Sequence, residues 1–394
     1  MLNLLLYILL GFLLGVITGL IPGVHPNLLA TLALSYLFFP PMESSVMLVA
    51  AGVTNTFVSF IPAVYLGAPS ASTALSVLPG HELLLKGRGL EAIRLTAVGG
   101  IVSAVLVAIS FPLFVMTIDS IYGFIEGYIH VALLLIIGFM VYKDRRFDSV
   151  VFFLLSGLLG YVVLEYNFIG TQHDLFPLLS GLFGVSILLN SVRRDPEIPP
   201  QNKSISYIGG RKALKEGTIG SIAGMVVGLL PGIGSAQATY VARELTGEED
   251  ERGFMLAIGG VNTSNIILSL LAVYLIGKGR SGIAVAVKNL MEAMTLNNAV
   301  MFVLVGLISA GLAAYTTIYL GKRSLGIFRK VNYRALCVGI IIFILLVSLV
   351  LTGIRGLSVT VIGSFLGLGA ILSGCRRSYL MGSILFPVIL FFLV

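Results

Sequence analysis

The chain has 394 residues, of which 57% are hydrophobic and 11% are charged, and its mean hydropathy is +1.03. Water-soluble domains carry roughly a quarter of their residues as Asp, Glu, Lys and Arg, so this composition excludes a soluble enzyme, a nucleic-acid-binding protein and a disordered chain. The net charge of +7 does not indicate a nucleic-acid partner, because membrane proteins concentrate Lys and Arg on the cytoplasmic side. We expect an all-α polytopic membrane protein with about 10–12 membrane segments.

Apolar stretches long enough to cross a bilayer, about 20 residues, follow one another along the chain. In the first half they are expected at 2–20, 44–66, 95–117, 124–142, 148–165 and 175–190. In the second half they are expected at 216–230, 254–276, 297–320, 334–352, 356–373 and 378–394. The first stretch lacks a basic n-region and a small-residue cleavage site, so we expect a retained membrane segment and not a signal peptide.

Four apolar pieces, 27–39, 67–80, 233–243 and 280–290, are too short to cross. Irregular backbone at membrane depth is tolerated only where protein or a wet cavity satisfies its N–H and C=O groups. We therefore expect these pieces to be half-helices or re-entrant segments beside an interior pathway.

The two halves of the chain share a glycine ladder that ends in Pro-Gly. The stretch GFLLGVITGLIPG, from Gly11 to Gly23, recurs as GSIAGMVVGLLPG, from Gly220 to Gly232. Downstream, GVTNTFVSFIPAVYL from Gly52 resembles GVNTSNIILSLLAVYL from Gly260. A ladder of five matched positions followed by a second matched block predicts an internal duplication.

The distribution of basic residues predicts that the two copies are inverted. Residues 118–127 and 166–174 carry no Lys or Arg, whereas 143–146 (KDRR) carries three, and in the second copy the loop at 321–334 is the basic one. By the positive-inside rule, equivalent loops then lie on opposite sides of the membrane. We expect a first repeat at 1–190, a cytoplasmic linker at 191–215 and a second repeat at 216–394, with both termini external.

Inverted repeats with paired segments interrupted by Gly and Pro are typical of secondary transporters, in which substrate and coupling ions bind near the midplane where helices break. Glycines four residues apart allow close helix packing, and Pro-Gly ends a helix. The exposed helix ends favour an anion at an N-terminus and a cation at a C-terminus.

Small polar side chains follow each expected break and also lie inside apolar spans. They are His25, Asn27 and Thr31; Thr54, Asn55, Thr56 and Ser59; Ser70, Ser72, Thr73 and Ser76, after Gly67 and Pro69; Ser235, Gln237 and Thr239; and Asn262, Thr263, Ser264, Asn265 and Ser269. The expected substrate site takes His25, Asn27, Asn55, Thr73, Gln237, Asn262 and Asn265 from these. The alternative is that these groups only join helices, worth about 0.6 kcal/mol per hydrogen bond.

No catalytic set is expected, because the few carboxylates lie mostly in predicted loops such as 244–253 and no Ser/His/Asp set or P-loop occurs. The scarcity of buried acids favours sodium over a carboxylate proton relay as coupling ion. Lys278, Arg280 and Lys288 are candidates to attract an anion, although interfacial snorkelling is the better explanation for each of them alone. Cys337 and Cys375 show no metal-binding spacing, and no cofactor beyond a coupling Na⁺ or H⁺ is expected.

The stretch GSIAGMVVGLLPGIGSAQATYVARELTG, from Gly220, resembles the large membrane subunit of tripartite tricarboxylate transporters, the TctA family. The stretch from Phe60 to Gly100 resembles the same family's apolar helix, Gly/Pro-Ser/Thr-Ala segment and basic loop. The resemblance implies uptake of di- or tricarboxylates with sodium or proton coupling, together with a small membrane subunit and an extracytoplasmic binding protein. It implies a site lined by Pro22, Gly23, Gly67, Pro69, Ser70, Ser72, Pro231, Gly232, Gly234 and Ser235, and a prokaryotic plasma membrane.

The chain departs from the family pattern in its shorter length, in Pro79-Gly80 before the basic loop, and in PGVHPN at the first break. Two other functions stay open. Polyprenyl-phosphate carrier translocases have similar Gly-rich inverted halves, and their phosphate headgroup would use the same helix-end anion site. The third alternative is a membrane scaffold that transports nothing.

Overall fold

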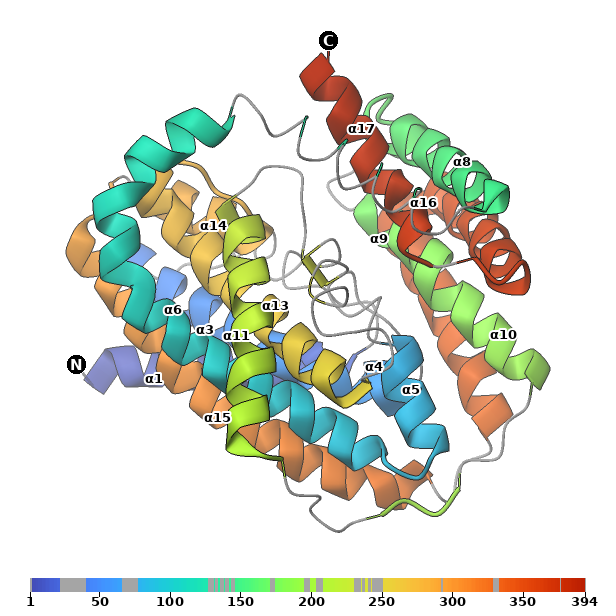
Figure 1. Ribbon diagram of the computed structural model, residues 1–394, viewed down its shortest axis with the longest axis horizontal. Helices are drawn as coiled ribbons and strands as arrows, with labels where there is room; N and C mark the ends of the chain where they lie inside the picture. Colours follow the sequence, from blue (N-terminus) through green and yellow to red (C-terminus); the bar gives the residue numbers. More distant parts are fainter. Residues whose placement is uncertain are drawn as a thin grey trace.

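The computed structural model describes residues 2–21, 40–65, 77–126, 146–170, 174–194, 199–202, 208–229, 251–291, 293–328, 333–375 and 377–393, with isolated positions at 131, 134, 138, 142, 235, 238, 239 and 242. Over these ranges the chain is helical and contains no strand. The helices form two groups that lie side by side, one around α3 and α13 and the other around α16 (Figure 1). The predicted all-α class is confirmed.

The helices of the first half correspond to most of the expected spans. They are α1 (Leu2–Leu20), α3 (Pro41–Val58), α4 (Phe60–Tyr65), α5 (Val77–Leu85), α6 (Gly89–Glu126), α8 (Phe147–Leu164), α9 (Leu175–Leu179), the π-helical turn η1 (Ser180–Val185) and α10 (Ser186–Arg194). The span expected at 44–66 is confirmed as Pro41–Tyr65, with a turn at Ser59 between α3 and α4. One expectation is wrong, because α6 continues through the loop expected at 118–127 as far as Glu126.

The second half shows the same mixture of long and short helices. They are α11 (Gly210–Leu229), α13 (Glu251–Ile276), α14 (Gly282–Leu290), α15 (Leu296–Phe328), α16 (Tyr333–Leu372), the 3₁₀ turn η2 (Arg377–Met381) and α17 (Gly382–Leu393). The short apolar helix expected at 280–290 is confirmed as α14. The break expected between 352 and 356 is confirmed within α16, where the chain turns at a single residue, Gly353, whose φ is +65°.

Six helical stretches in the described ranges are long and apolar enough to span a bilayer: Pro41–Tyr65, Gly89–Ile118, Phe147–Leu164, Glu251–Ile276, Leu296–Leu325 and Cys337–Leu372. Leu4–Leu20 and Phe176–Asn190 are apolar but shorter. This is fewer than the expected number of segments. Part of the difference comes from α16, which contains two expected spans. Another part comes from α11, which begins with the polar stretch GRKALKEG and is therefore not apolar enough to count as a span despite its length.

The glycine ladders bring two pairs of helices into close contact. A Cβ atom on Gly15 would lie 2.6 Å from the carbonyl oxygen of Ala51, and one on Gly19 would lie 2.7 Å from Cβ of Val58. In the second copy, Gly220, Gly224 and Gly228 of α11 meet α13 in the same way. Neither interface has room for a side chain at these positions, so the ladders serve helix packing as the sequence predicts.

These contacts correct the predicted alignment of the two copies. Gly15 meets Ala51 and Thr54, whereas Gly224 meets Val261 and Ser264. The glycines are 209 residues apart, but their partners are 210 apart. Gly52 is therefore equivalent to Asn262 and not to Gly260, and Asn55 is equivalent to Asn265.

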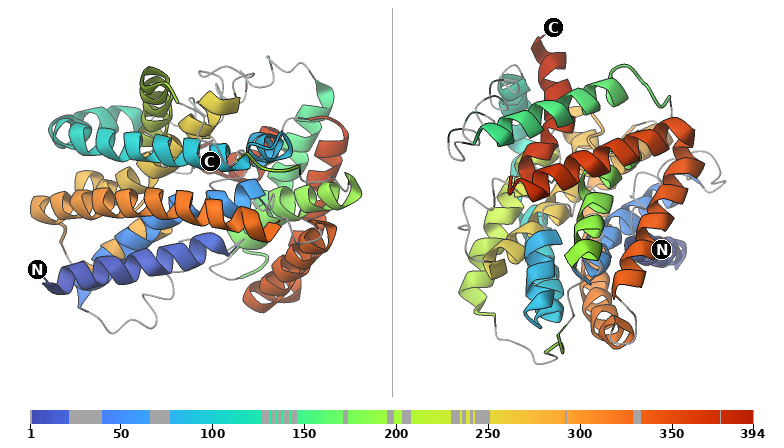
Figure 2. Two further views of the ribbon diagram at one scale, coloured as in Figure 1. Left: turned by 90° about the horizontal axis from the view of Figure 1, so that it is seen from below. Right: turned by 90° about the vertical axis from the view of Figure 1, so that its right-hand side faces the viewer.

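Pairwise contacts give the relative directions of the helices. As residue numbers rise along α1 they also rise along its partner α3, from Ala51 at Gly15 to Val58 at Gly19, and α11 and α13 are parallel in the same way. Along α6, by contrast, Gly89 lies beside Tyr65 and Gly100 beside Phe57, so α6 is antiparallel to the α3–α4 segment. Figure 2 shows α6 running opposite to α1 and α15.

The direction of α11 follows from its contacts with α6. Gly217 lies against Val102, and Ser110 Oγ lies 3.7 Å from Sδ of Met225, so both helices advance together. Since α11 is parallel to α6, and α6 is antiparallel to α3 and hence to α1, α1 and α11 run in opposite senses.

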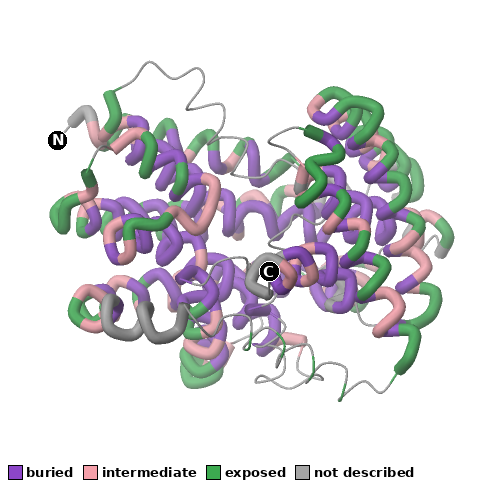
Figure 3. Tube along the Cα trace, turned by 90° about the horizontal axis from the view of Figure 1, so that it is seen from above, coloured by how far each residue is buried: buried purple, intermediate pink, exposed green. Residues whose placement is uncertain are grey.

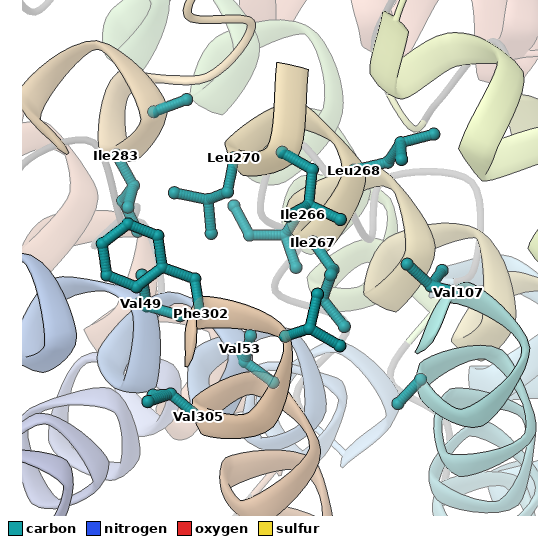
Figure 4. Packing of buried hydrophobic residues seen from close by; sticks show 14 of the residues in the cluster. Val49, Val53, Val107, Ile266, Ile267, Leu268, Leu270, Ile283, Phe302 and Val305 are labelled. Atoms are coloured by element: carbon teal, nitrogen blue, oxygen red, sulfur yellow. The ribbon is translucent and has the colours of Figure 1, made fainter. Parts of the chain in front are cut away.

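The core lies where both copies meet. Val49 and Val53 of α3 pack with Ile266, Ile267 and Leu270 of α13, with Ile283 of α14 and with Phe302 and Val305 of α15 (Figure 4). Every residue in the most apolar stretch of α3 is buried, and nearly every one in that of α13. Helices α1, α8, α15 and α16 expose many large apolar side chains, mainly Leu, Ile, Val, Phe and Tyr. Figure 3 shows that exposed residues lie on the outer sides of the helices. An apolar outer surface is the arrangement expected in a bilayer.

The second group contains helices from both halves. Gly157 and Gly160 of α8 pack against Phe386 and Ser383 of α17, while Gly363 and Gly367 of α16 pack against η1. Buried side chains of this group also contact Val227 and Val261 of the first group. The chain therefore forms one assembly in which each group takes helices from both halves.

Candidate functional site

Most residues of the predicted site lie outside the described part of the chain. These are Pro22, Gly23, His25, Asn27, Gly67, Pro69, Ser70, Ser72, Thr73, Pro231, Gly232, Gly234 and Gln237. Helix α1 ends at Leu20 and Ile21 is in a bend, so the helix stops before the first Pro-Gly pair. Asn55, Ser235, Asn262 and Asn265 are described.

The polar segments of α3 (54–59) and α13 (262–265) meet at Gly100 of α6. A Cβ atom on Gly100 would lie 2.6 Å from Cε1 of Phe57 and 2.9 Å from Oγ1 of Thr263. Gly52 of α3 likewise lies against Ile266 of α13. The structure therefore brings together two polar clusters that are about half the chain apart. The sequence reasoning did not select Gly100, although the Gly99-Gly100 pair inside an apolar helix is a recognisable mark of close backbone approach.

Asn55 is fixed by a residue from the glycine ladder. Its Nδ2 donates a hydrogen bond to Oγ1 of Thr18, 3.1 Å away, and the Thr18 hydroxyl donates to the carbonyl of Leu14. Asn55 is buried. The sequence reasoning did not select Thr18, which lies between two ladder glycines, and its equivalent in the second copy is Val227. Asn265 is half-buried and has no comparable hydroxyl on α11.

Asn262 is the least satisfied polar side chain of the two segments. It is 2% exposed, and neither Oδ1 nor Nδ2 has a hydrogen-bond partner in the described structure. Leaving a buried polar group unpaired costs about 1–3 kcal/mol. Polar side chains buried inside membrane proteins mark substrate or ion pathways.

The contacts of α13 indicate what Asn262 faces. Nζ of Lys86, just after α5, lies 2.6 Å from Oε1 of Glu251, and Met255 lies next to Gly80 of α5. Helix α5 is therefore antiparallel to α13. Asn262 is seven residues beyond Met255, so the two side chains lie on nearly the same face of α13. This is the face that α5 packs against, and Asn262 lies in the direction of the N-terminal end of α5. An N-terminal helix end favours an anion.

The second copy has a matching short helix, α14, on the opposite long helix. Ile283 of α14 packs against Gly52 of α3, just as α5 packs against α13. The first turn of α14 is capped, because Oγ of Ser281 accepts from the backbone N–H of Ala284 at 3.2 Å and from Ser269 Oγ at 3.0 Å. Each short helix thus packs against the long helix of the other copy: α5 against α13, and α14 against α3.

Ser235 and Thr239 lie in one helical turn. Oγ1 of Thr239 donates to the carbonyl of Ser235 at 2.7 Å, and both residues are buried. The contact joins the segment internally and does not by itself indicate a ligand.

Two carboxylates at one end of the first helix group are buried in helices, unlike the majority that were expected in loops. Glu91 is 8% exposed and receives two hydrogen bonds from Arg88, at 2.7 and 2.8 Å, while Nε of Arg252 lies 2.8 Å away. This pairing raises the pKa of the Arg88 guanidinium above its usual value. Glu216 of α11 is also buried, 3.3 Å from Nζ of Lys215. The ion pairs of Glu251 and Glu91 connect α13 to the α5–α6 corner.

Residues 199–202, inside the predicted linker, bind to the same corner. Gln201 donates to the carbonyl of Leu84 at 2.8 Å and accepts from the N–H of Gly89 at 2.9 Å. The N–H of Asn202 donates to the carbonyl of Gly87, whose φ is +76°. The two ends of the 191–215 segment are helical, because α10 continues to Arg194 and α11 begins at Gly210.

The basic residues expected to attract an anion have other contacts. Nζ of Lys288 donates to the carbonyl of Gly277 at 2.7 Å, next to the end of α13, and Lys278 and Arg280 also have partners. A Lys at a helix C-terminus stabilises the helix dipole. In the described part of the chain no group of three or more His, Cys, Asp or Glu could hold a metal ion.

Comparison with known proteins identifies the family. The pattern of the tripartite tricarboxylate transporter TctA family matches residues 5–382. The chain belongs to the TctA family. It is also 34% identical, over 373 residues and 92% of each chain, to an uncharacterized protein of Methanocaldococcus jannaschii. No solved structure matches.

Membership in the TctA family makes the protein a component of a tripartite tricarboxylate transporter. The family is one of transporters and not of enzymes, and its tripartite nature implies other subunits and a binding protein. Together with the apolar spans, this establishes a multi-pass membrane protein.

Proposed function

We propose that this TctA protein is the subunit through which a di- or tricarboxylate crosses the membrane, and that the anion binds where α3, α13 and α5 approach one another. The observation that carries this proposal is Asn262, a fully buried amide without a partner on the α5-facing side of α13. A carboxylate would accept from its Nδ2 and interact favourably with the N-terminal end of α5.

We propose alternating access by two inverted copies as the mechanism. The opposite directions of α1 and α11, and the exchange of α5 and α14 between the copies, support this view. In inverted-repeat transporters one bundle moves against the other around a fixed central site. Here the closely packed pairs α1–α3 and α11–α13 would move as units, because their interfaces leave no space for sliding.

We also propose that the linker 191–215 lies in the cytoplasm of a prokaryotic cell, a topology that the positive-inside rule supports. Several basic residues belong to helix ends that meet at this side of the first helix group. They are Lys86, Arg88, Arg94, Arg252, Lys322 and Arg323. We further propose coupling to Na⁺ or H⁺, and a small membrane subunit and an extracytoplasmic binding protein as partners.

The test is uptake of labelled citrate and succinate into proteoliposomes that contain the chain with its binding protein and small subunit, with and without sodium and proton gradients. Asn262→Ala should lower uptake about tenfold or more, because it removes a hydrogen bond to a charged ligand. Its stability should be unchanged or higher, because the variant no longer buries an unpaired amide. Asn297→Ala, an exposed asparagine in the first turn of α15, is the matched control.

Wild-type uptake by Asn262→Ala would refute the proposed location. No uptake of any carboxylate under any gradient would refute the function, and translocation of a short-chain polyprenyl phosphate by the same vesicles would then favour the lipid-carrier alternative.

A further inference from the structure

Helices α6 and α15, one from each copy, pack against each other in opposite directions (Figure 2). Near the start of α6 and the end of α15 the two helices are in close contact. A Cβ atom on Gly321 would lie 3.2 Å from Cδ1 of Ile93 and 3.6 Å from Cδ1 of Leu90. Arg94 follows Ile93 in the sequence, and Lys322 follows Gly321. The two basic residues therefore lie at the same level of the helix pair.

Both cations also lie on the same side of the α6–α15 contact. Each is one residue, or about 100° of rotation, beyond the residue that makes the contact. Because the helices are antiparallel, these two rotations lead to the same side. Helix α3 packs on the other side, where Phe57 lies against Gly100 of α6 and Val53 against Gly306 of α15.

The side that carries the two cations is turned outward. Tyr315 is seven residues before Lys322 and hence on nearly the same face of α15, and it is 75% exposed. Val105, eleven residues after Arg94 on α6, is 44% exposed. Lys322 is exposed and Arg94 is half-buried. In a protein that spans a bilayer, exposed apolar side chains contact the acyl chains, so lipid covers the surface next to both cations.

The cations lie where a lipid headgroup is expected. The exposed face of α15 carries an apolar stripe of Val300, Leu304, Ile308 and Leu312. The stripe is followed by Tyr315 and Tyr319, whose rings are stacked with centroids 6.4 Å apart. The rise from Val300 to Tyr319 is about 28 Å, close to the thickness of the hydrocarbon core, about 30 Å. Tyr is enriched at the boundary with the headgroups, and Lys322 is nearly one turn beyond this boundary.

The positive charge at this place is not neutralised by the protein. Glu91, one turn before Arg94, is already engaged by Arg88 at 2.7 Å and by Arg252 at 2.8 Å. Helix α15 contains no Asp or Glu. Within the described ranges, Arg94 and Lys322 have no hydrogen bond or ion pair. Basic residues between membrane helices at headgroup level attract anionic lipids.

We propose that Arg94 and Lys322 bind the phosphate of an anionic phospholipid, whose acyl chains lie along the exposed apolar face of α15. The guanidinium of Arg94 can donate two parallel hydrogen bonds to phosphate oxygens, and the ammonium of Lys322 supplies a second positive charge. Charge complementarity favours phosphatidylglycerol over phosphatidylcholine, whose choline group compensates the phosphate. Since α6 and α15 belong to different copies, the bound lipid would connect the two copies.

The test measures lipid binding to the purified chain, so it does not depend on transport or on the identity of the solute. The chain in detergent micelles receives dioleoyl phosphatidylglycerol or dioleoyl phosphatidylcholine, and native mass spectrometry counts the lipids that stay bound. Thermal unfolding, reported by a dye that reacts with the buried thiols of Cys337 and Cys375, should show a saturable stabilisation by phosphatidylglycerol. Arg94→Gln and Lys322→Gln should each weaken the apparent affinity about fivefold, and the double variant should not distinguish the two lipids.

Arg323→Gln is the matched control. Arg323 is next to Lys322, but it lies about 100° further round α15 and its guanidinium is over the ring of Tyr319, 5.1 Å from the centroid. This variant loses the same charge and should keep the preference for phosphatidylglycerol. The single variants at Arg94 and Lys322 should unfold at the wild-type temperature without lipid, because neither side chain has a partner to lose.

The proposal is overturned if the wild-type chain does not prefer phosphatidylglycerol, or if both Arg94→Gln and Lys322→Gln keep the wild-type affinity. An equal loss in Arg323→Gln and Lys322→Gln would also overturn it, since the preference would then reflect overall surface charge. Stabilisation by sodium phosphate alone, as large as that by phosphatidylglycerol, would show a site for a free anion and would refute a lipid site.

Discussion

Replacing a glycine of the ladder by alanine should weaken the α1–α3 interface by an amount that the structure allows us to work out. The new Cβ atom of Gly15→Ala would lie 2.6 Å from the carbonyl oxygen of Ala51 and 2.6 Å from Cβ of Thr54. Ordinary contacts of such atoms begin near 3.4 Å, so the helices would have to separate by about 0.8 Å. Both neighbouring atoms belong to the helix and cannot rotate away.

A gap of this size forfeits about a quarter to a half of the dispersion energy of each contact that it opens. Overpacking of this kind costs about 1–3 kcal/mol, and the higher helix propensity of alanine returns up to about 1 kcal/mol. We expect Gly15→Ala to lower the free energy of unfolding by about 1–2 kcal/mol, which is a large effect in a bilayer because helix association there depends on van der Waals packing.

Gly311→Ala is the matched control, because this glycine is also inside a long helix, α15, and a Cβ atom there would meet nothing within 4 Å. This variant should be more stable than the wild type by about 0.5–1 kcal/mol. Unfolding titrations in mixed micelles, followed by helical content and by labelling of the two buried cysteines, measure both changes. A Gly15→Ala protein as stable as Gly311→Ala would refute the packing argument.

Four further variants test three other features. Glu91→Gln leaves Arg88 and Arg252 without their shared carboxylate and should lower the free energy of unfolding by about 1–2 kcal/mol. Lys86→Ala breaks a more exposed ion pair and should lower it by less than about 1 kcal/mol. Unfolding titrations compare the two variants. Gly87→Ala forces a left-handed conformation on alanine and should cost about 1–2 kcal/mol, with faster proteolysis of the 191–215 segment as the sensitive measurement. Gly353→Ala should lower the free energy of unfolding by about 1–3 kcal/mol in the same titration. The cost comes from the positive φ alone, because the new Cβ atom would meet nothing within 4 Å. An unchanged stability would mean that the backbone at this corner of α16 relaxes.

The sequence predicted helices best where apolar length and glycine spacing act together. Residues 2–20 and 148–165 correspond closely to α1 and α8, and the ladder at Gly11, Gly15 and Gly19 lies in the interface that its spacing predicts. Both features are local, since they depend on the residues of one helix. Boundaries set by tertiary contacts were less predictable. Helix α6 continues past the expected end at 117 because nothing in its own sequence stops it before Glu126.

The candidate site was predicted in part. Asn55, Asn262 and Asn265 were selected because they are polar residues in apolar spans, and the structure brings their two segments together at Gly100. The predicted alignment of the two copies was wrong by two positions at its start, since it matched Gly52 with Gly260 and not with Asn262. Both copies contain Gly-Val followed by Thr and Asn in either order, but these motifs are not at equivalent places in the structure. Identical residue types therefore gave a wrong alignment, because the equivalent positions of the two copies are established by their contacts with the ladder glycines.

Burial of charge was the property least accessible to the sequence. Glu91 falls between the spans expected at 44–66 and 95–117, and its burial depends on Arg88 from the same corner and on Arg252 from the other half of the chain. A carboxylate can be buried when oppositely charged groups surround it, but a partner 161 residues away cannot be recognised from composition.

The difference between the two copies has one source that can be located in the chain. Three residues separate Ser59 from Ala63, but only two separate the equivalent Ser269 from Ala272. The first copy therefore has one residue more at this point, and one of its three is Pro62, which cannot donate to the preceding turn. The extra residue is accommodated by interrupting the helix at Ser59, whereas α13 needs no interruption. The two copies of a duplicated fold therefore differ at this point because of a single inserted residue, which separates α3 from α4 in the first copy and has no counterpart in the continuous helix α13.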